Sequence, residues 1–355
     1  MRFVPVSIQK KLTSSRPGLT LSLGAALFIL PILVPLPGLA ETQDFNGLNE
    51  RILKQTTALD QQESQLGRYH MSLAEPLHTL ARIQLQANRF DDARGNADRA
   101  LQIIRWSDGL ESTLQFEFLQ LVIEIEMARN NWDDIDKKIK HYTWLLSNKY
   151  RGDSISRLRH MQWLVDVHAG GAARDEKERR AYHLIQSTGI NEVAVQYAQV
   201  QGLTAEPLYA NLLFSLSRAY HRENEGIRQR GSVSYRLREL YPGLHILEDR
   251  DVAIAKRYRF GLEKLEMLRD AVSTSPAFDT EAVLLSEFYI AAWNELYGQE
   301  EDLKASLLRI DNFHAHSAIS KERIMRLFEL RAKLPQHRLV LDADYLSNDL
   351  VSAGD

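Results

Sequence analysis

Residues Leu77–Leu101 form the stretch LHTLARIQLQANRFDDARGNADRAL, in which apolar side chains recur three and four positions apart. This spacing places them along one face of an α-helix, whereas a strand would alternate apolar and polar residues. Asn88 interrupts the pattern, and the spacing resumes after it at Phe90, Ala93, Ala97, Ala100 and Leu101. Because asparagine favours turns, the stretch predicts two helices joined by a short turn. The alanines are small enough for the two helix axes to approach closely.

Two more segments share this layout of helix, turn and helix. In one, Leu119, Val122, Ile123 and Met127 precede Asn130-Asn131, and Trp132, Ile135, Ile139 and Tyr142 follow. In the other, Ile290, Ala291 and Trp293 precede Gly298, and Leu303, Leu307 and Ile310 follow. Phe90 and Trp132 stand at equivalent places, 42 residues apart. A helix pair with two apolar faces buries both only by stacking on other pairs, so the pattern predicts an all-α stack of repeats.

The stretch resembles a tetratricopeptide repeat. Leu80-Ala81 stand where that family has Leu-Gly, and Ala93 and Ala100 stand at its small positions. The departures are Leu77 for tryptophan, Gln84 for tyrosine, Ala97 for a large apolar residue and Arg105 for proline. The 42-residue step is similar to the extended form of the repeat in kinesin light chains, and the chain also resembles exported tetratricopeptide proteins of Gram-negative bacteria. The resemblance implies a solenoid of antiparallel helix pairs wound into a right-handed superhelix.

The N-terminal residues have the pattern of an export signal. The basic residues Arg2, Lys10, Lys11 and Arg16 precede an apolar stretch from Leu19 through Leu36, and the small residues Gly38 and Ala40 precede polar sequence. This pattern predicts a signal peptide over residues 1–40, cleaved after Ala40. We therefore expect an exported protein, located in the periplasm. The alternative is an uncleaved segment that anchors the protein in the inner membrane, facing the periplasm, and no other membrane contact is expected.

Glycine, asparagine and proline punctuate the rest of the chain and suggest its organisation. Breaks are expected near Gly67, Gly109, Gly152, Gly189, Gly202, Pro242-Gly243 and Ser275-Pro276, with a hinge at Gly170-Gly171. The expected divisions are a helical lead-in (41–72), two clear repeats (73–150), degenerate helical repeats (151–275), a C-terminal repeat with a capping helix (276–335) and a tail (336–355). The polar, basic segment from Ile319 to Leu334 is typical of a cap, so we expect a monomer.

Composition excludes several classes of function. The chain of 355 residues contains no cysteine, which excludes disulfides, thiolate metal sites, cysteine nucleophiles and a lipoprotein anchor. Without residues 1–40, 40 basic residues face 47 acidic ones, a net charge of about −7. Nucleic-acid binding requires a basic surface, so no nucleic-acid partner is expected.

No motif in the sequence predicts catalysis or a cofactor. Acidic clusters at Asp91-Asp92, Asp133-Asp134 and Glu300-Glu301-Asp302 fall in the first turn of predicted second helices, where they stabilise the helix dipole. His314 and His316 are the closest histidine pair, but side chains two residues apart on a helix point to different sides. We therefore expect no catalytic residue, no metal site and no cofactor.

The candidate site is a groove for a protein or peptide partner. In the family that the chain resembles, the first helices of successive repeats line such a groove. Packing uses Leu77, Leu80 and Ala81, and this leaves an adjoining face for the partner. The residues on this face are His78, Arg82, Leu85 and Gln86 on the first such helix, and Gln120, Glu124 and Met127 on the second. An alternative hypothesis is a small-ligand or enzymatic pocket within residues 151–275.

Overall fold

The computed structural model describes residues 45–230 and 250–316, which all fall within one compact unit of the chain. These residues form α-helices and one short 3₁₀ helix, with no strand among them, which confirms the expected all-α fold. None of the described helices is long and apolar enough to cross a membrane. The helices are α1 (Phe45–Leu66), η1 (Met71–Leu73), α2 (Ala74–Gln86), α3 (Phe90–Asp108), α4 (Gln115–Ala128), α5 (Trp132–Asn148), α6 (Ser154–Arg174), α7 (Lys177–Val200), α8 (Pro207–Arg230), α10 (Arg250–Thr274), α11 (Thr280–Leu296) and α12 (Glu300–His316).

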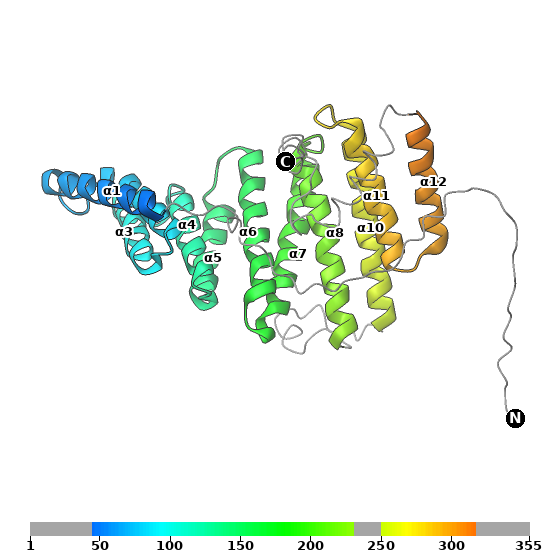
Figure 1. Ribbon diagram of the computed structural model, residues 1–355, viewed down its shortest axis with the longest axis horizontal. Coiled ribbons are helices and arrows are strands. Elements are labelled where there is room, and N and C mark those ends of the chain that lie inside the picture. Colours follow the sequence, from blue (N-terminus) through cyan, green and yellow to red (C-terminus); the bar gives the residue numbers. More distant parts are fainter. Residues whose placement is uncertain (1–44, 231–249, 317–355) are drawn as a thin grey trace, which may run out of the picture. The chain divides into compact units, whose positions relative to one another are not determined.

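Helices that follow one another along the chain pack against one another (Figure 1). The pairs are α2 with α3, α4 with α5, α6 with α7, α8 with α10, and α11 with α12. Between pairs, α3 packs on α4, α5 on α6, α7 on α8, and α10 on α11. This succession of helix pairs is a helical-repeat-like architecture, and it includes the described parts of residues 151–275, which are 151–230 and 250–275.

Three of the predicted turns have the same left-handed backbone. Asn88, Asn130 and Gly298 have φ angles of 58°, 57° and 68°, and each ends the first helix of a pair. Asparagine and glycine tolerate this conformation better than other residues. After each turn residue, the next backbone N–H donates to a carbonyl five residues earlier and so satisfies the end of the helix. These bonds join Arg89 to Gln84, Asn131 to Glu126 and Gln299 to Asn294, at 2.8, 2.9 and 2.9 Å.

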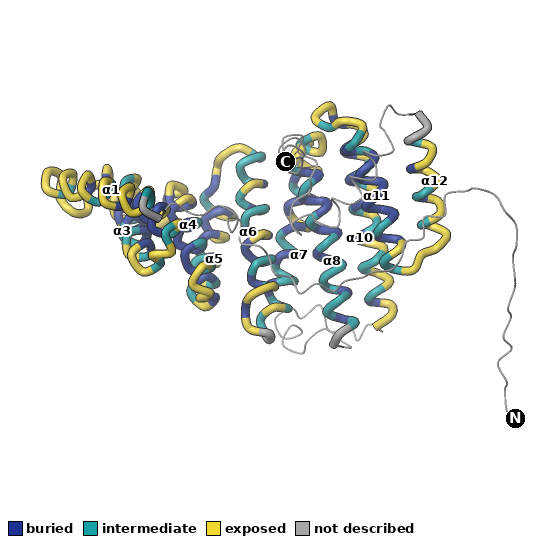
Figure 2. Tube along the Cα trace, in the orientation of Figure 1, coloured by how far each residue is buried: buried dark blue, intermediate teal, exposed yellow. Residues whose placement is uncertain are grey.

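The cores of the repeated pairs contain side chains that the spacing predicts, such as Ala81, Val122 and Ala291, together with others that it did not include. Ala81, Ala93 and Ala97 are buried together with Leu121, Val122 and Ile125, so α2 and α3 pack closely and α4 covers them. Leu284, Phe288, Ala291 and Ile310 form the corresponding cluster between α11 and α12. Figure 2 shows that α11 is buried along most of its length, whereas α1 is largely exposed.

The predicted acidic clusters lie in the first turns of α3, α5 and α12, as expected. Several of them also form ion pairs. Asp92 pairs with Arg89 at 2.7 Å, and Asp134 pairs with Arg94 at 2.9 Å. The clusters therefore stabilise helix ends and connect neighbouring helices.

Two of the predicted interruptions are wrong. Gly170-Gly171 lie inside α6 and form no hinge, and Gly189 lies inside α7. A Cβ atom at Gly171 would lie 2.6 Å from Cγ of His183, so the glycine makes room for a side chain of the next helix. Packing, rather than a turn, accounts for this glycine.

Some of the predicted features lie outside the described residues. They are the signal peptide (1–40), the break at Pro242-Gly243, the capping segment 319–334 and the tail (336–355).

Candidate interaction surface

The four predicted surface residues of α2 differ in how accessible they are. Arg82 and Gln86 are exposed, and Leu85 is partly buried beside the alanine-rich core. His78 is buried, with 8% of its surface exposed, and its ring meets Phe118 of α4 edge to face at 5.1 Å between centroids. Burial lowers the pKa of His78, which favours the neutral ring. His78 therefore packs α2 against α4 and offers little surface to a partner.

The three predicted residues of α4 also have different surroundings. Gln120 donates from Nε2 to the hydroxyl oxygen of Tyr142 at 2.8 Å. Met127 lies close to α6, because a Cβ atom at Gly170 would come 3.0 Å from its Cε atom. Glu124 is partly buried, and burial raises its pKa while the positive charge of Arg82 partly opposes that rise. Arg82 and Glu124 thus bring opposite charges near one another on successive first helices.

Arg94, a partly buried charge on the second helix α3, is paired, unlike Glu124. Arg94 of α3 forms salt bridges with Glu126 at 2.7 Å and with Asp134 at 2.9 Å. Among the described residues, neither Arg82 nor Glu124 has an ion-pair or hydrogen-bond partner for its side chain. A carboxylate that has lost part of its hydration without gaining a partner is unfavourable in the free protein. A bound ligand with complementary charge would relieve this penalty.

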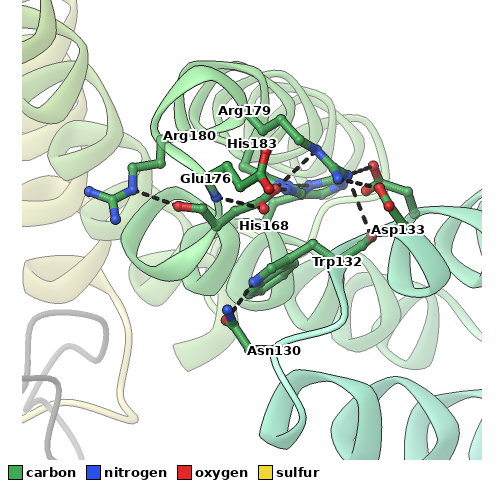
Figure 3. Close-up of polar contacts among 10 residues, drawn as sticks. Asn130, Trp132, Asp133, His168, Glu176, Arg179, Arg180 and His183 are labelled. Carbon is green, nitrogen blue, oxygen red and sulfur yellow. Dashed lines mark hydrogen bonds and ion pairs between the residues drawn. The ribbon is translucent and has the colours of Figure 1, made fainter.

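A cluster of polar side chains joins α5, α6 and α7 (Figure 3). Nε2 of His183 lies 2.9 Å from Oδ2 of Asp175, and Nδ1 of His183 lies 3.0 Å from Nδ1 of His168. Asp175 accepts the Nε2 proton of His183, so Nδ1 of a neutral His183 accepts the proton of His168. Arg179 contacts the same Oδ2 atom of Asp175 at 3.1 Å. It also forms ion pairs with Asp133 and Asp136 of α5.

This cluster is buried and both of its histidines are held neutral. His183, His168 and Asp175 are 0%, 2% and 3% exposed. Burial lowers the pKa of His168 to about 3, with a smaller contribution from the charge of His183, and burial also lowers the pKa of His183. The chain of Asp175, His183 and His168 resembles a catalytic relay in its connectivity, but a substrate would not reach it in this arrangement. Its evident role is to fasten the helix pair α4–α5 to α6–α7.

Metal binding has no geometric support in the part of the chain that the structure describes. No three or more histidine, aspartate or glutamate side chains within residues 45–230 and 250–316 are grouped so that they could hold an ion. His314 and His316 both belong to α12, in agreement with the helical placement expected from the sequence. The side chains of these two residues lie outside the described part.

The sequence pattern missed the histidine cluster and a pair of arginines on α8, Arg218 and Arg222. His168 and His183 lie on different helices, and only their packing brings them together. Arg218 and Arg222 are four residues apart, which places them on one helix face, but the sequence does not reveal whether a carboxylate neutralises them. No protein-family model matches the chain, and no match is found among curated proteins.

Proposed function

We propose that this protein is a tetratricopeptide-type scaffold of the bacterial envelope that holds a segment of a protein partner along the face formed by its first helices. The observation that carries the proposal is the pairing of charges. Arg94 of α3 pairs with Glu126 and Asp134, whereas Arg82 of α2 and Glu124 of α4 remain without partners among the described residues. A surface with charged groups beside partly buried apolar side chains, such as Leu85, suits a protein partner.

Two further features support the repeat assignment. The turns at Asn88, Asn130 and Gly298 share one backbone conformation and one hydrogen-bond pattern. Equivalent polar residues also precede these turns. Gln84 accepts from Asn96 at 2.8 Å, and Asn294 donates to Ser306 at 3.3 Å, so in both pairs the partner lies 12 residues later. Location in the envelope rests on the signal-like pattern of residues 1–40.

Affinity capture tests this function. The protein without residues 1–40 would be immobilised and incubated with envelope extracts, and captured proteins would be identified by mass spectrometry. We expect the double reversal Arg82→Glu with Glu124→Arg to reduce the recovery of specific partners. The control is Lys140→Glu with Asp311→Lys, which reverses two exposed charges on second helices without changing the net charge. If the wild type, the Arg82/Glu124 reversal and the control variant recover the same partners equally, the partner does not bind this face.

A further inference from the structure

The side chains of Phe214, Arg218 and Arg222 form a stripe along α8. They are four residues apart, so they lie on one face of the helix. The opposite face carries Tyr220 and Glu223, which bind residues of α7 and α10. The stripe therefore faces away from both second helices that pack on α8.

Aromatic rings lie beneath one of the two guanidinium groups. The Arg218 guanidinium lies over the Phe214 ring, 5.8 Å from its centroid. Phe214 in turn packs on Tyr289 of α11, the first helix of the next pair, with 4.6 Å between ring centroids. Phe214 and Tyr289 are buried, whereas both arginines are partly buried. Arg218 thus lies above an aromatic floor, and both arginines keep part of their surface exposed.

No carboxylate neutralises the two guanidinium groups among the described residues. Burial lowers the pKa of Arg218 to about 9, and the positive charge of Arg222 contributes to the same shift. Burial lowers the pKa of Arg222 as well, and no described acid opposes this effect. The nearby acids of α8 are engaged elsewhere, since Glu223 pairs with Arg257 at 2.6 Å and Glu225 with Arg228 at 3.1 Å.

Two partly desolvated like charges four residues apart destabilise the free protein. Packing alone does not require them, because uncharged side chains of similar length would fill the same space without repulsion. A carboxylate placed between them would supply the missing negative charge and accept hydrogen bonds from both planar guanidinium groups. Because the aromatic floor holds Arg218 in position, little of its side-chain entropy would be lost on binding.

We propose that Arg218 and Arg222 bind a carboxylate of an acidic segment in the protein partner. This inference rests on the proposed function and adds the chemistry of the partner to it. Charge complementarity identifies the occupant, since an acidic peptide offers the carboxylates that residues 45–230 and 250–316 do not place at this site. The site lies on a first helix, as do Arg82 and Glu124, and Phe214 joins it to the first helix of the following pair.

The first test measures stability without any ligand. We expect Arg218→Gln with Arg222→Gln to leave the melting temperature unchanged or to raise it, because the change removes an uncompensated pair of charges. The control, Lys137→Gln with Arg259→Gln, removes two exposed charges from second helices. A melting temperature several degrees lower only in the Arg218/Arg222 variant would mean that the two arginines stabilise the fold, and it would overturn the proposal.

The second test measures binding with a defined probe. A library of displayed dodecapeptides would be selected on the wild-type protein, and selected peptides would be assayed by fluorescence polarisation. We expect enrichment in aspartate and glutamate, and binding weaker by about tenfold or more in the Arg218/Arg222 variant, as for the loss of a charge-assisted hydrogen bond. The control variant should bind as the wild type does.

Three outcomes would contradict the proposal. The first is that the selected peptides show no enrichment in acidic residues. The second is that they bind the wild type and the Arg218/Arg222 variant with equal affinity. The third is that the site binds inorganic phosphate but no acidic peptide. The capture experiment separates this inference from the proposed function. If reversal at Arg82 and Glu124 abolishes capture while the Arg218/Arg222 variant retains every partner, only the carboxylate site is wrong.

Discussion

The buried pair of histidines makes stability depend on pH. His168 has an ordinary pKa of 6.5, and burial lowers it to about 3 in the folded protein. The unfolded chain therefore takes up a proton at a higher pH than the folded protein does. The stabilising effect of a neutral His168 is complete above about pH 7 and is lost as the pH falls from 6.5 toward 3. Acid thus favours unfolding through this residue.

The size of the effect follows from the two pKa values. Each pH unit between them changes the free energy of unfolding by about 1.4 kcal/mol, so a fall to about pH 5 removes roughly 2 kcal/mol through His168. His168→Asn removes the titrating ring but keeps an amide N–H that can donate to Nδ1 of His183. We expect this variant to be less stable than the wild type at about pH 7.5, because the substitution leaves a cavity. On acidification to about pH 5, its free energy of unfolding should fall by about 2 kcal/mol less than that of the wild type.

Urea unfolding followed by circular dichroism at a series of pH values measures this difference. Other histidines with lowered pKa values, such as His78 and His160, occur in both proteins, and their contributions largely cancel in the comparison. Val167→Ala is the packing control, because Val167 is buried beside His168 but does not titrate. Equal pH dependence in the wild type and His168→Asn would refute the reasoning, whatever the stability of the variant at neutral pH.

Five more outcomes are expected. Gly171→Ala should lower the free energy of unfolding by about 1–3 kcal/mol, because its Cβ would lie 2.6 Å from Cγ of His183. Gly189→Ala, with no atom within 4 Å of the added Cβ, should raise it by about 0.5–1 kcal/mol, and urea unfolding of both variants measures the contrast. Glu126→Ala should lower it by about 1–3 kcal/mol in the same assay, because the buried Glu126 carboxylate accepts hydrogen bonds from Arg94 at 2.7 Å and Asn131 at 2.6 Å, and the change removes both. Leu121→Ala, at a fully buried position, should lower it by about 2–5 kcal/mol. Light scattering on the protein without residues 1–40 should give the mass of one chain.

Local chemistry made part of the fold predictable. A turn after Ala87 needs only a residue that tolerates a left-handed backbone, and Asn88 provides it within the quoted stretch. The same reasoning identified Gly298. Gly171 misled the prediction because its role depends on His183, a residue of another helix whose position the local sequence does not specify. Glycines that serve turns were therefore predictable, whereas a glycine that serves packing was not.

The candidate surface was predictable only in outline. Helical periodicity placed Arg82 and Glu124 outside the apolar core, as the structure has them. The same periodicity placed His78 on the accessible face, where α4 in fact covers it through Phe118. A helix pattern shows which face turns away from its own partner, but not how closely the next first helix approaches that face.

Helix α8 shows why charge must be assigned by contact rather than by proximity in sequence. Glu223 and Glu225 lie one and three residues after Arg222, so by sequence alone they would neutralise the arginines of this helix. In the fold, Glu223 turns toward α10 and pairs with Arg257, while Glu225 pairs with Arg228 one turn later. Arg218 and Arg222 are thus left with positive charge that the described part of the fold does not use. Because an unused, partly buried charge destabilises a protein, its presence on the face that we assign to the partner favours a role in recognition.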